Sequence, residues 1–234
     1  MTGVGLYGGY RGRNWYWERS EVFKHFTLKS LANQTNKDFI IWMSFRREEE
    51  NKPTTKAIAD DIKKAGLRYV FTFDGLMYHD DKFSDGFVNK AKNIGRCLRD
   101  WYRNNRSFTD VMGAIGEIYI NKNSTLEKRL AHSLAILEPA FGKSEWITVT
   151  RIDSDDMFHK QAVKIIQEVE PFVGALVCGK GIIYNTATEE LAEWNPPTNP
   201  PFHTVFFPTP IFFDASSYLL HFWDFKSHED IPNI

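Results

Sequence analysis

Three short apolar runs constrain the fold of this chain more than any other feature. They are Asp38–Phe45 (DFIIWMSF), Leu67–Phe73 (LRYVFTF) and Trp146–Ile152 (WITVTRI). The first is a continuous apolar run, typical of a strand buried on both faces of a parallel sheet, and the other two also predict strands. Helix-like segments separate the runs, and alternating strands and helices favour a parallel sheet covered by helices. We therefore expect an α/β fold with a mainly parallel central sheet flanked by helices.

The expected helices carry recognisable start and stop signals. Trp17–Asn33 places apolar side chains on one face. Pro53 suits the first turn of a helix that ends at Gly66, because proline favours helix starts and glycine favours the position after the end. Ser124–Glu127 matches a capping box and predicts another helix start. A further helix is expected over His159–Val169.

The last third of the chain has a different pattern. Ala175–Tyr184 and Glu189–Trp194 are expected to pair as a hairpin, Asn195–Pro210 is rich in proline, and Asp214–Phe225 predicts a short helix. We expect this part to form a smaller mixed β region. The length of 234 residues suits one domain, so residues 1–234 are expected to fold together.

The composition excludes several classes of protein. A net charge of −1 argues against a broad surface that neutralises nucleic-acid phosphates, and 42% hydrophobic residues argue against a disordered tail. Only two cysteines are present, and no run of 18 apolar residues occurs. We therefore expect a soluble protein of a reducing compartment, the cytoplasm, with no membrane span and no nucleic-acid partner.

An acidic cluster directly follows the third apolar run. Asp153, Asp155 and Asp156 place three carboxylates within four residues, and Arg151 stands just before them. Mg²⁺ or Mn²⁺ binds one or two carboxylates together with phosphate oxygens, and an arginine binds a diphosphate bidentately. The alternative is an acidic turn whose carboxylates are solvated or cap the next helix. The cluster predicts a site for a metal ion and a phosphorylated ligand.

The ends of the three apolar runs are expected to meet. In open α/β sheets, ligands bind beyond the carboxyl ends of the strands. This rule groups Phe45–Arg46, Asp74–Gly75 and Asp153–Asp156 at one edge of the expected sheet. The Gly3–Gly8 segment matches the dinucleotide pattern G-x-G-x-x-G, but only two residues precede it. Because that fingerprint needs a strand before its first glycine, we do not assign a dinucleotide site.

Several segments together resemble nucleotide-sugar glycosyltransferases with the GT-A fold. The matching segments are SLANQT at 30–35 with DFII at 38–41, similar to an "SLxxQT…EIIV" opening, KAKNIG at 90–95, similar to "ARNxG", and TRIDSDD at 150–156, similar to the DxD motif. The form TRIDSDD, the helix with Trp17–Arg19 and Phe23, and NPPFHT at 199–204 resemble the rhamnosyltransferase branch most closely. The resemblance covers roughly residues 15–213.

This resemblance implies a GT-A-like domain that binds a nucleotide-diphosphate sugar through residues 1–157 and an acceptor through residues 158–234. The implied activity is a metal-dependent glycosyltransferase, with Mn²⁺ or Mg²⁺ as the cofactor. It would move a sugar, rhamnose by the branch resemblance, onto a hydroxyl of a glycan or glycoprotein. Two alternatives remain at this point: a Mg²⁺-dependent phosphotransfer or phosphatase enzyme, and a non-catalytic carbohydrate-binding protein.

The resemblance also implies roles for individual residues. The expected metal ligands are Asp153, Asp155, Asp156 and the late His228. The expected nucleotide-binding residues are Asp74, Arg46, Ser44, Lys92, Arg151 and Asp153. The candidates for the base that deprotonates the acceptor are Asp230, Glu229 and Asp214, and stacking on the acceptor sugar is expected from Trp194 and Trp223. The alternatives are a charged chain end for residues 228–230 and a helix N-cap for Asp214.

Overall fold

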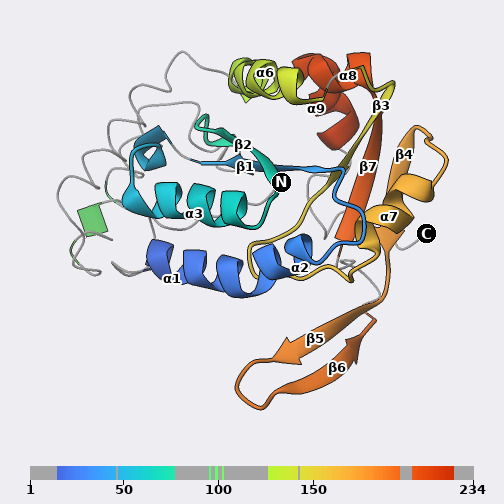
Figure 1. The fold of residues 1–234 in the computed structure, drawn as a ribbon. Helices are drawn as coiled ribbons and strands as arrows, with labels where there is room; N and C mark the ends of the chain where they lie inside the picture. The colour runs from blue at the N-terminus through green and yellow to red at the C-terminus, as the bar shows by residue number, and fades with distance from the viewer. Residues whose placement is uncertain are drawn as a thin grey trace.

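The computed structural model describes residues 15–45, 47–76, 95, 98–99, 102, 126–141, 143–195 and 202–223 (Figure 1). The elements in these ranges are, in chain order, α1 (Trp15–Val22), the π-helix η1 (Phe23–Leu28), α2 (Lys29–Ala32), β1 (Ile40–Ser44), the 3-10 helix η2 (Arg47–Glu49), α3 (Pro53–Lys64), β2 (Arg68–Thr72), α6 (Leu126–Leu137), the 3-10 helix η6 (Glu138–Ala140), β3 (Trp146–Thr150), α7 (Ala162–Glu168), β4 (Gly174–Cys178), β5 (Gly181–Asn185), β6 (Glu190–Trp194), β7 (Phe202–Pro208), α8 (Thr209–Phe213) and α9 (Ala215–Trp223). Among these residues, no helix has the length and apolar character needed to cross a membrane.

The first two strands form a parallel pair with helices on both sides. β1 and β2 run from Ile40 opposite Arg68 to Ser44 opposite Thr72. Trp42 packs into a cluster that includes α6, whereas Met43 on the other face packs against α3 and η1. Figure 1 shows this order, with α6 on one side of the strands and α3 and α1 on the other. The expectation of a strand buried on both faces is confirmed for β1.

The expectation of a mainly parallel central sheet is wrong. In the described part of the chain, parallel pairing is limited to β1 and β2, and the GT-A-like arrangement is not found. β3 and β4 both pair with β7, which lies between them and runs antiparallel to each. β5 and β6 form a separate antiparallel hairpin. The third apolar run therefore joins an antiparallel sheet, and it does not extend the pair β1–β2.

The physical reason for this difference is β7, a buried strand inside the proline-rich stretch. Its central residues are buried, and Phe207 reaches 0% exposure. Prolines disfavour a central strand because they donate no hydrogen bond to the ladder. Pro208, however, lies opposite Trp146 of β3 and beyond the last β4 partner at Phe206. The strand thus keeps its proline at an end where only one neighbour runs alongside.

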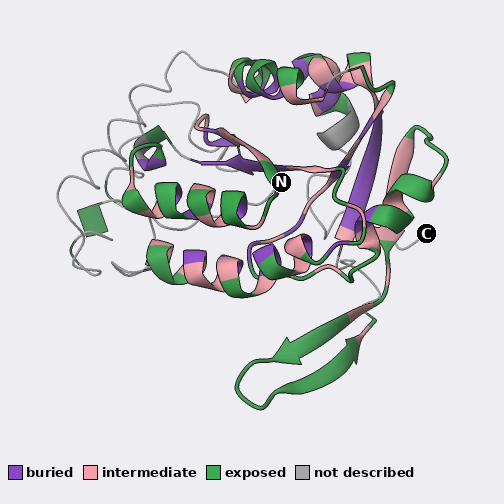
Figure 2. Cartoon of the chain, viewed as in Figure 1, coloured by how far each residue is buried: buried purple, intermediate pink, exposed green. Residues whose placement is uncertain are grey.

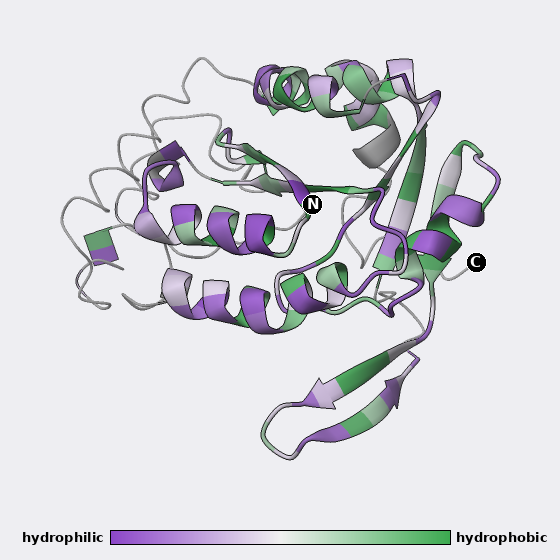
Figure 3. Cartoon of the chain, viewed as in Figure 1, coloured by the Kyte–Doolittle hydropathy of each residue, from purple (hydrophilic) through white to green (hydrophobic). Residues whose placement is uncertain are grey.

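The buried side chains form two clusters, one on each side of β1. The first contains Phe207, whose ring stacks on Tyr218 with a centroid distance of 5.1 Å. The second gathers Phe23 of η1, Met43 of β1 and Ile62 of α3. Figure 2 shows that β7 is buried over its central residues, and Figure 3 shows apolar residues along the same strand. Most of the aromatic content of the described part is therefore core packing.

The hairpin β5–β6 projects away from the rest of the molecule (Figure 1). Most of its residues are exposed, as the green colour in Figure 2 shows. The sequence suggested one strand over Ala175–Tyr184, but the strand breaks after Cys178 and divides into β4 and β5. The first half joins the sheet through β7, and only the second half pairs with β6.

Most local predictions of helix ends are confirmed. α3 begins at Pro53, and the chain leaves it through Gly66, whose φ is 69°. α7 and α9 lie within the segments predicted to be helical, and the first helical segment contains the π-helical turn η1. The capping residues Ser124 and Thr125 lie outside the described residues.

Candidate functional site

The acidic cluster after β3 is held by an arginine from the first helix. Nη1 of Arg19 donates a hydrogen bond to Oδ2 of Asp155 at 2.8 Å, and Nη2 forms an ion pair with Oδ1 of the same carboxylate. Nε of Arg19 donates to Oγ of Ser154 at 2.6 Å. Ser154 is 2% exposed, so the loop is anchored beneath its charged residues. One guanidinium therefore makes three contacts with two consecutive residues of the loop.

The second arginine near the cluster is Arg151, at the end of β3. Its Nη2 lies 3.6 Å from Oδ1 of Asp153. The side chain of Arg151 is 19% exposed, whereas that of Asp153 is 41% exposed. We call the set of Arg19, Arg151, Asp153, Asp155 and Asp156 the charged loop site. It combines two guanidinium groups and three carboxylates at one partly exposed surface.

Within the charged loop site, Asp156 is the carboxylate whose pKa is shifted. Burial, together with the charges of Asp153 and Asp155, raises the pKa of Asp156 to about 6. Its backbone N–H donates to the carbonyl oxygen of Asp153 at 3.2 Å, which closes the loop as a tight turn. The positive charge of Arg19 acts in the opposite direction and favours the ionised form. The loop thus concentrates negative charge, and Arg19 relieves part of the repulsion.

The segment after the charged loop is fastened to α2 by buried polar contacts. The N–H of Phe158 donates to Oγ of Ser30 at 3.1 Å, and the N–H of Val163 donates to Oε1 of Gln34 at 3.1 Å. Nε2 of Gln34 donates to the carbonyl oxygen of His159 at 3.0 Å. Ser30 and Gln34 are the serine and glutamine of the SLANQT segment. The SLANQT segment is therefore joined in space to the residues that follow the TRIDSDD segment.

A divalent cation held by the three aspartates does not fit this arrangement. Both oxygens of Asp155 face the guanidinium of Arg19, and Arg151 lies beside Asp153. Among the described residues, no three histidine, cysteine, aspartate or glutamate side chains gather as they would around one ion. A cation at Asp155 would share one carboxylate with Arg19, and the repulsion between the two positive charges disfavours it.

Asp74 and Ser44 lie at the ends of β2 and β1, as expected from the sequence. The backbone joins these ends, because the N–H of Gly75 donates to the carbonyl oxygen of Phe45 at 2.9 Å. Ser44 is buried, and its Oγ accepts a hydrogen bond from the N–H of Leu76 at 3.2 Å. The Ser44 hydroxyl therefore bonds the chain that follows β2. Its predicted contact with a nucleotide is not tested by this arrangement and stays a prediction.

The carboxylate of Asp74 is engaged by α6. It accepts a hydrogen bond from Oγ of Ser133 at 2.5 Å and lies 2.9 Å from Nδ1 of His132. Nη1 of Arg129, on the same helix, donates to the carbonyl oxygen of Asp74 at 3.2 Å. These contacts fasten the end of β2 to α6. The assignment of Asp74 to the nucleotide also stays a prediction.

The other predicted site residues are placed as follows. Asp214 caps α9, because its Oδ2 accepts a hydrogen bond from the N–H of Ser217 at 2.8 Å. These contacts with Ser217 hold the pKa of Asp214 below its ordinary value. Trp194 is half-buried at the end of β6, opposite Gly181, where the hairpin meets the body. The residues outside the described ranges are Arg46, Lys92, His228, Glu229 and Asp230, together with the side chain of Trp223.

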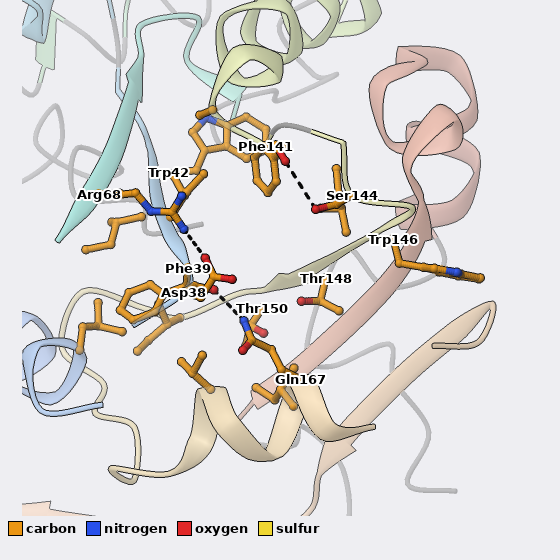
Figure 4. A pocket seen from close by; sticks show the side chains of 18 of the residues that line it. Asp38, Phe39, Trp42, Arg68, Phe141, Ser144, Trp146, Thr148, Thr150 and Gln167 are labelled. Carbon is orange, nitrogen blue, oxygen red and sulfur yellow. Dashed lines mark hydrogen bonds and ion pairs between the residues drawn. The ribbon is translucent and has the colours of Figure 1, made fainter. Parts of the chain in front are cut away.

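A cavity of about 270 Å³ opens between β1, β3 and α7 (Figure 4). Aromatic side chains such as Trp42 and Phe141 line it. An ion pair between Arg68 and Asp38, with a distance of 2.6 Å, lies at its wall. The five residues of the charged loop site do not line this cavity. It is therefore distinct from the charged loop site, although Thr150 and Ile152 of its lining come shortly before Asp153 in sequence.

Sequence reasoning missed the role of Arg19, which it noted only as part of a matching segment. The sequence gives little indication of this contact, because Arg19 and Asp155 lie 136 residues apart and no local pattern connects them. Ser154 was likewise overlooked between its acidic neighbours, although its burial shows that it anchors the loop. A comparison of the chain with family models, curated proteins and solved structures finds no match.

Proposed function

We propose that this protein is a glycosyltransferase, which transfers a sugar from a nucleotide-diphosphate sugar to a hydroxyl of a glycan or glycoprotein. The observation that carries the proposal is the charged loop site, where Arg19 and Arg151 lie beside Asp155 and Asp153 at the end of β3. A nucleotide sugar has matching chemistry, with a diphosphate for the arginines and hydroxyl groups for the carboxylates. The resemblance of the TRIDSDD segment to a DxD motif supports the same assignment.

The charged loop site would act on the departure of the nucleoside diphosphate. As the bond between sugar and phosphate breaks, negative charge develops on the leaving phosphate oxygen. Guanidinium groups held in advance at that position stabilise this charge without reorganising during the reaction. Three contacts with the loop hold Arg19, and Arg151 follows directly from β3. Asp153 would accept hydrogen bonds from the ribose or the sugar.

The acceptor side of the reaction needs a proton acceptor if the configuration at the sugar is inverted. Asp214 already serves as the cap of α9. We therefore assign this role to the late carboxylates Glu229 or Asp230, as the resemblance implies. The finer proposal that the sugar is rhamnose rests on the same resemblance. The proposal that Trp194 contacts the acceptor rests on its place in the last third of the chain and on the flat apolar face of its ring.

A panel of thermal-shift measurements tests the proposal. Nucleoside diphosphates and their sugars, including rhamnose donors, are added to the wild type and to Asp153→Asn. At least one donor should raise the melting temperature of the wild type, because a ligand that binds only the folded state stabilises it. The shift should shrink in Asp153→Asn and persist in the control Asp60→Asn, which changes an exposed aspartate on α3.

Product analysis separates the proposal from its two alternatives. A glycosyltransferase releases a nucleoside diphosphate when an acceptor glycan is present. A phosphatase or phosphotransfer enzyme releases or transfers phosphate and leaves the sugar on its carrier. A carbohydrate-binding protein binds free sugars and gives no product. If no nucleotide or donor shifts the melting temperature, and no nucleoside diphosphate is released with any acceptor, the proposal is wrong.

A further inference from the structure

The charged loop site already contains a cation within bonding distance of its acidic residues. Arg19 occupies both oxygens of Asp155 and also bonds Ser154. Mg²⁺ in phosphate-binding sites is usually held by one or two carboxylates and by phosphate oxygens of the ligand. A metal ion at Asp155 would share the carboxylate with the Arg19 fork, and the two positive charges would repel each other. Arg19 therefore takes the place at Asp155 where the sequence predicted a metal ion.

The charges of the site are nearly balanced without a metal ion. Asp153, Asp155 and Asp156 supply three carboxylates, and Arg19 and Arg151 supply two guanidinium groups. One negative charge is left when all five groups are ionised. A metal ion would be a third cation at a loop where Asp155 and Asp153 are already paired with guanidinium groups, so it would gain little there. A dianionic diphosphate, by contrast, would meet two guanidinium groups that are already in place.

We propose that Arg19 is the resident cation of the charged loop site: it holds Asp155 in place of a divalent metal ion and binds the diphosphate of the donor directly. This inference rests on the proposed function, and it specifies how the donor is recognised. Its consequence is that donor binding requires Arg19 and does not require Mn²⁺ or Mg²⁺.

The donor groups of Arg19 are sufficient for both tasks. A guanidinium carries five N–H donors in a rigid plane. The hydrogen bonds to Asp155 and Ser154 use three of them, which leaves two for a phosphate. The side chain of Arg19 is 26% exposed, so part of it reaches solvent where a ligand can approach. The loop thus orients the guanidinium and leaves part of its hydrogen-bonding capacity open.

The helix that carries Arg19 is fixed in place by its neighbours. The hydroxyl of Tyr16 lies 2.7 Å from Oγ1 of Thr55 in α3. Because Oγ1 of Thr55 donates its hydrogen to the carbonyl oxygen of Glu49, Tyr16 is the donor in this contact. Ser20, the residue after Arg19, is buried and bonds the carbonyl oxygen of Trp17. Arg19 therefore projects from a rigid support, which is what a preorganised phosphate contact needs.

The first test titrates Mn²⁺ alone into the protein and follows the free ion by electron paramagnetic resonance. The wild type should bind Mn²⁺ weakly, whereas Arg19→Gln should bind it at least tenfold more tightly, because Asp155 is then open to the ion. Lys24→Gln is the matched control, since Lys24 lies one turn further along the helical segment and pairs with Asp61 at 3.5 Å. It removes the same charge and should leave Mn²⁺ binding unchanged. Equal Mn²⁺ affinity in the wild type and Arg19→Gln would overturn the claim that Arg19 replaces a metal ion.

The second test measures the binding of UDP, GDP and dTDP by calorimetry, in EDTA and in Mn²⁺. The wild type should bind one of them with similar affinity in both buffers. Arg19→Gln should bind it at least tenfold more weakly in EDTA, and Lys24→Gln should match the wild type. Arg19→Lys keeps the positive charge but loses the planar guanidinium, so its affinity should fall between those of Arg19→Gln and the wild type. With this second variant, a folding defect in Arg19→Gln alone does not decide the result.

The outcomes distinguish this inference from the proposed function. Binding by the wild type only in Mn²⁺, or equal binding by Arg19→Gln and the wild type in EDTA, overturns the inference and leaves the proposed function standing. Failure of all three nucleotides, and of their sugars, in both buffers overturns the proposed function and, with it, the diphosphate contact. The Mn²⁺ titration then decides by itself whether Arg19 occupies a metal position.

Discussion

The side chain of Gln34 and the backbone of Val163 form a buried hydrogen bond that joins α2 to the start of α7. Oε1 of Gln34 accepts from the N–H of Val163 at 3.1 Å, while its Nε2 donates to the carbonyl oxygens of His159 and Ser30, each at 3.0 Å. A single amide thus satisfies three backbone groups on two segments. Because the charged loop lies between β3 and α7, this link helps to fix its position.

Replacing Gln34 by alanine should therefore destabilise the fold strongly. The change leaves backbone groups of Val163 and His159 without their partner, and an unsatisfied buried group costs about 1–3 kcal/mol. We expect Gln34→Ala to lower the free energy of unfolding by about 3 kcal/mol, as measured by urea denaturation. The control is Gln167→Ala, which removes an exposed amide that bonds the carbonyl oxygen of Asp38 at 2.6 Å. Its effect should stay within about 0.5 kcal/mol, and similar losses in the two variants would contradict the argument.

Local sequence patterns predicted the elements of this fold better than their assembly. The apolar run that contains β1, the proline that starts α3 and the glycine that ends it depend on neighbouring residues only. Backbone preference and burial act locally at these positions, so the sequence contains enough information. The same holds for the capping residue Asp214.

The assembly of the sheet could not be predicted in this way. Whether β3 pairs in parallel with β1 or antiparallel with β7 depends on contacts between residues more than 50 positions apart, such as Val149 and Val205. Because prolines flank β7, the sequence pattern did not predict this strand, and β7 is the strand with which β3 pairs. In the candidate site, the acidic cluster was visible because its members are consecutive. Its partner Arg19 was not, because only the fold brings α1 to the end of β3.

The hydroxyl of Ser133 should contribute to stability through its contact with Asp74. Ser133 is fully buried, and its Oγ donates to Oδ2 of Asp74 at 2.5 Å. A hydrogen bond to a charged group contributes about 1.5–3 kcal/mol, so Ser133→Ala should lower the free energy of unfolding by about 2 kcal/mol. Ser216→Ala is the matched control, because its exposed hydroxyl donates to Glu127 at the same distance of 2.5 Å. Chemical denaturation should show less than about 0.5 kcal/mol for this control; a comparable loss would mean that burial does not set the difference.

Substitution of Gly66 should destabilise the fold because of its backbone conformation and not because of crowding. Its φ of +69° is unfavourable for residues with a Cβ atom, although no heavy atom lies within 4 Å of an added Cβ. Gly66→Ala should therefore lower the free energy of unfolding by about 1 kcal/mol, and Gly66→Asn should cost less, since asparagine tolerates this conformation. Gly179 offers the same open space without a positive φ, so Gly179→Ala should leave the melting temperature unchanged. Equal melting temperatures for the two alanine variants would refute the assignment of the cost to φ.

Asp156 should make the protein lose stability as the pH rises. Burial and the two neighbouring aspartates raise its pKa in the folded state from an ordinary 3.8 to about 6. The unfolded chain therefore releases this proton at lower pH than the folded protein does. The stability contributed by this group is fully present below about pH 4 and is lost as the pH rises through about 6. Asp156→Asn removes the titrating group, so the free energy of unfolding of the variant should rise relative to that of the wild type between pH 4 and pH 7.

Urea unfolding of both proteins at four pH values across this range measures the difference directly. Asp214→Asn is the control with the opposite sign. Its hydrogen bonds with Ser217 lower the pKa of Asp214, so its contribution is present at neutral pH and is lost as the solution becomes acidic. The asparagine still caps α9, because both side chains accept from the backbone N–H. The free energy of unfolding of the wild type, relative to Asp214→Asn, should therefore fall as the solution becomes acidic. Relative to Asp156→Asn, it should fall as the pH rises toward neutral. A pH-independent difference between wild type and Asp156→Asn would show that Asp156 keeps an ordinary pKa in the folded protein.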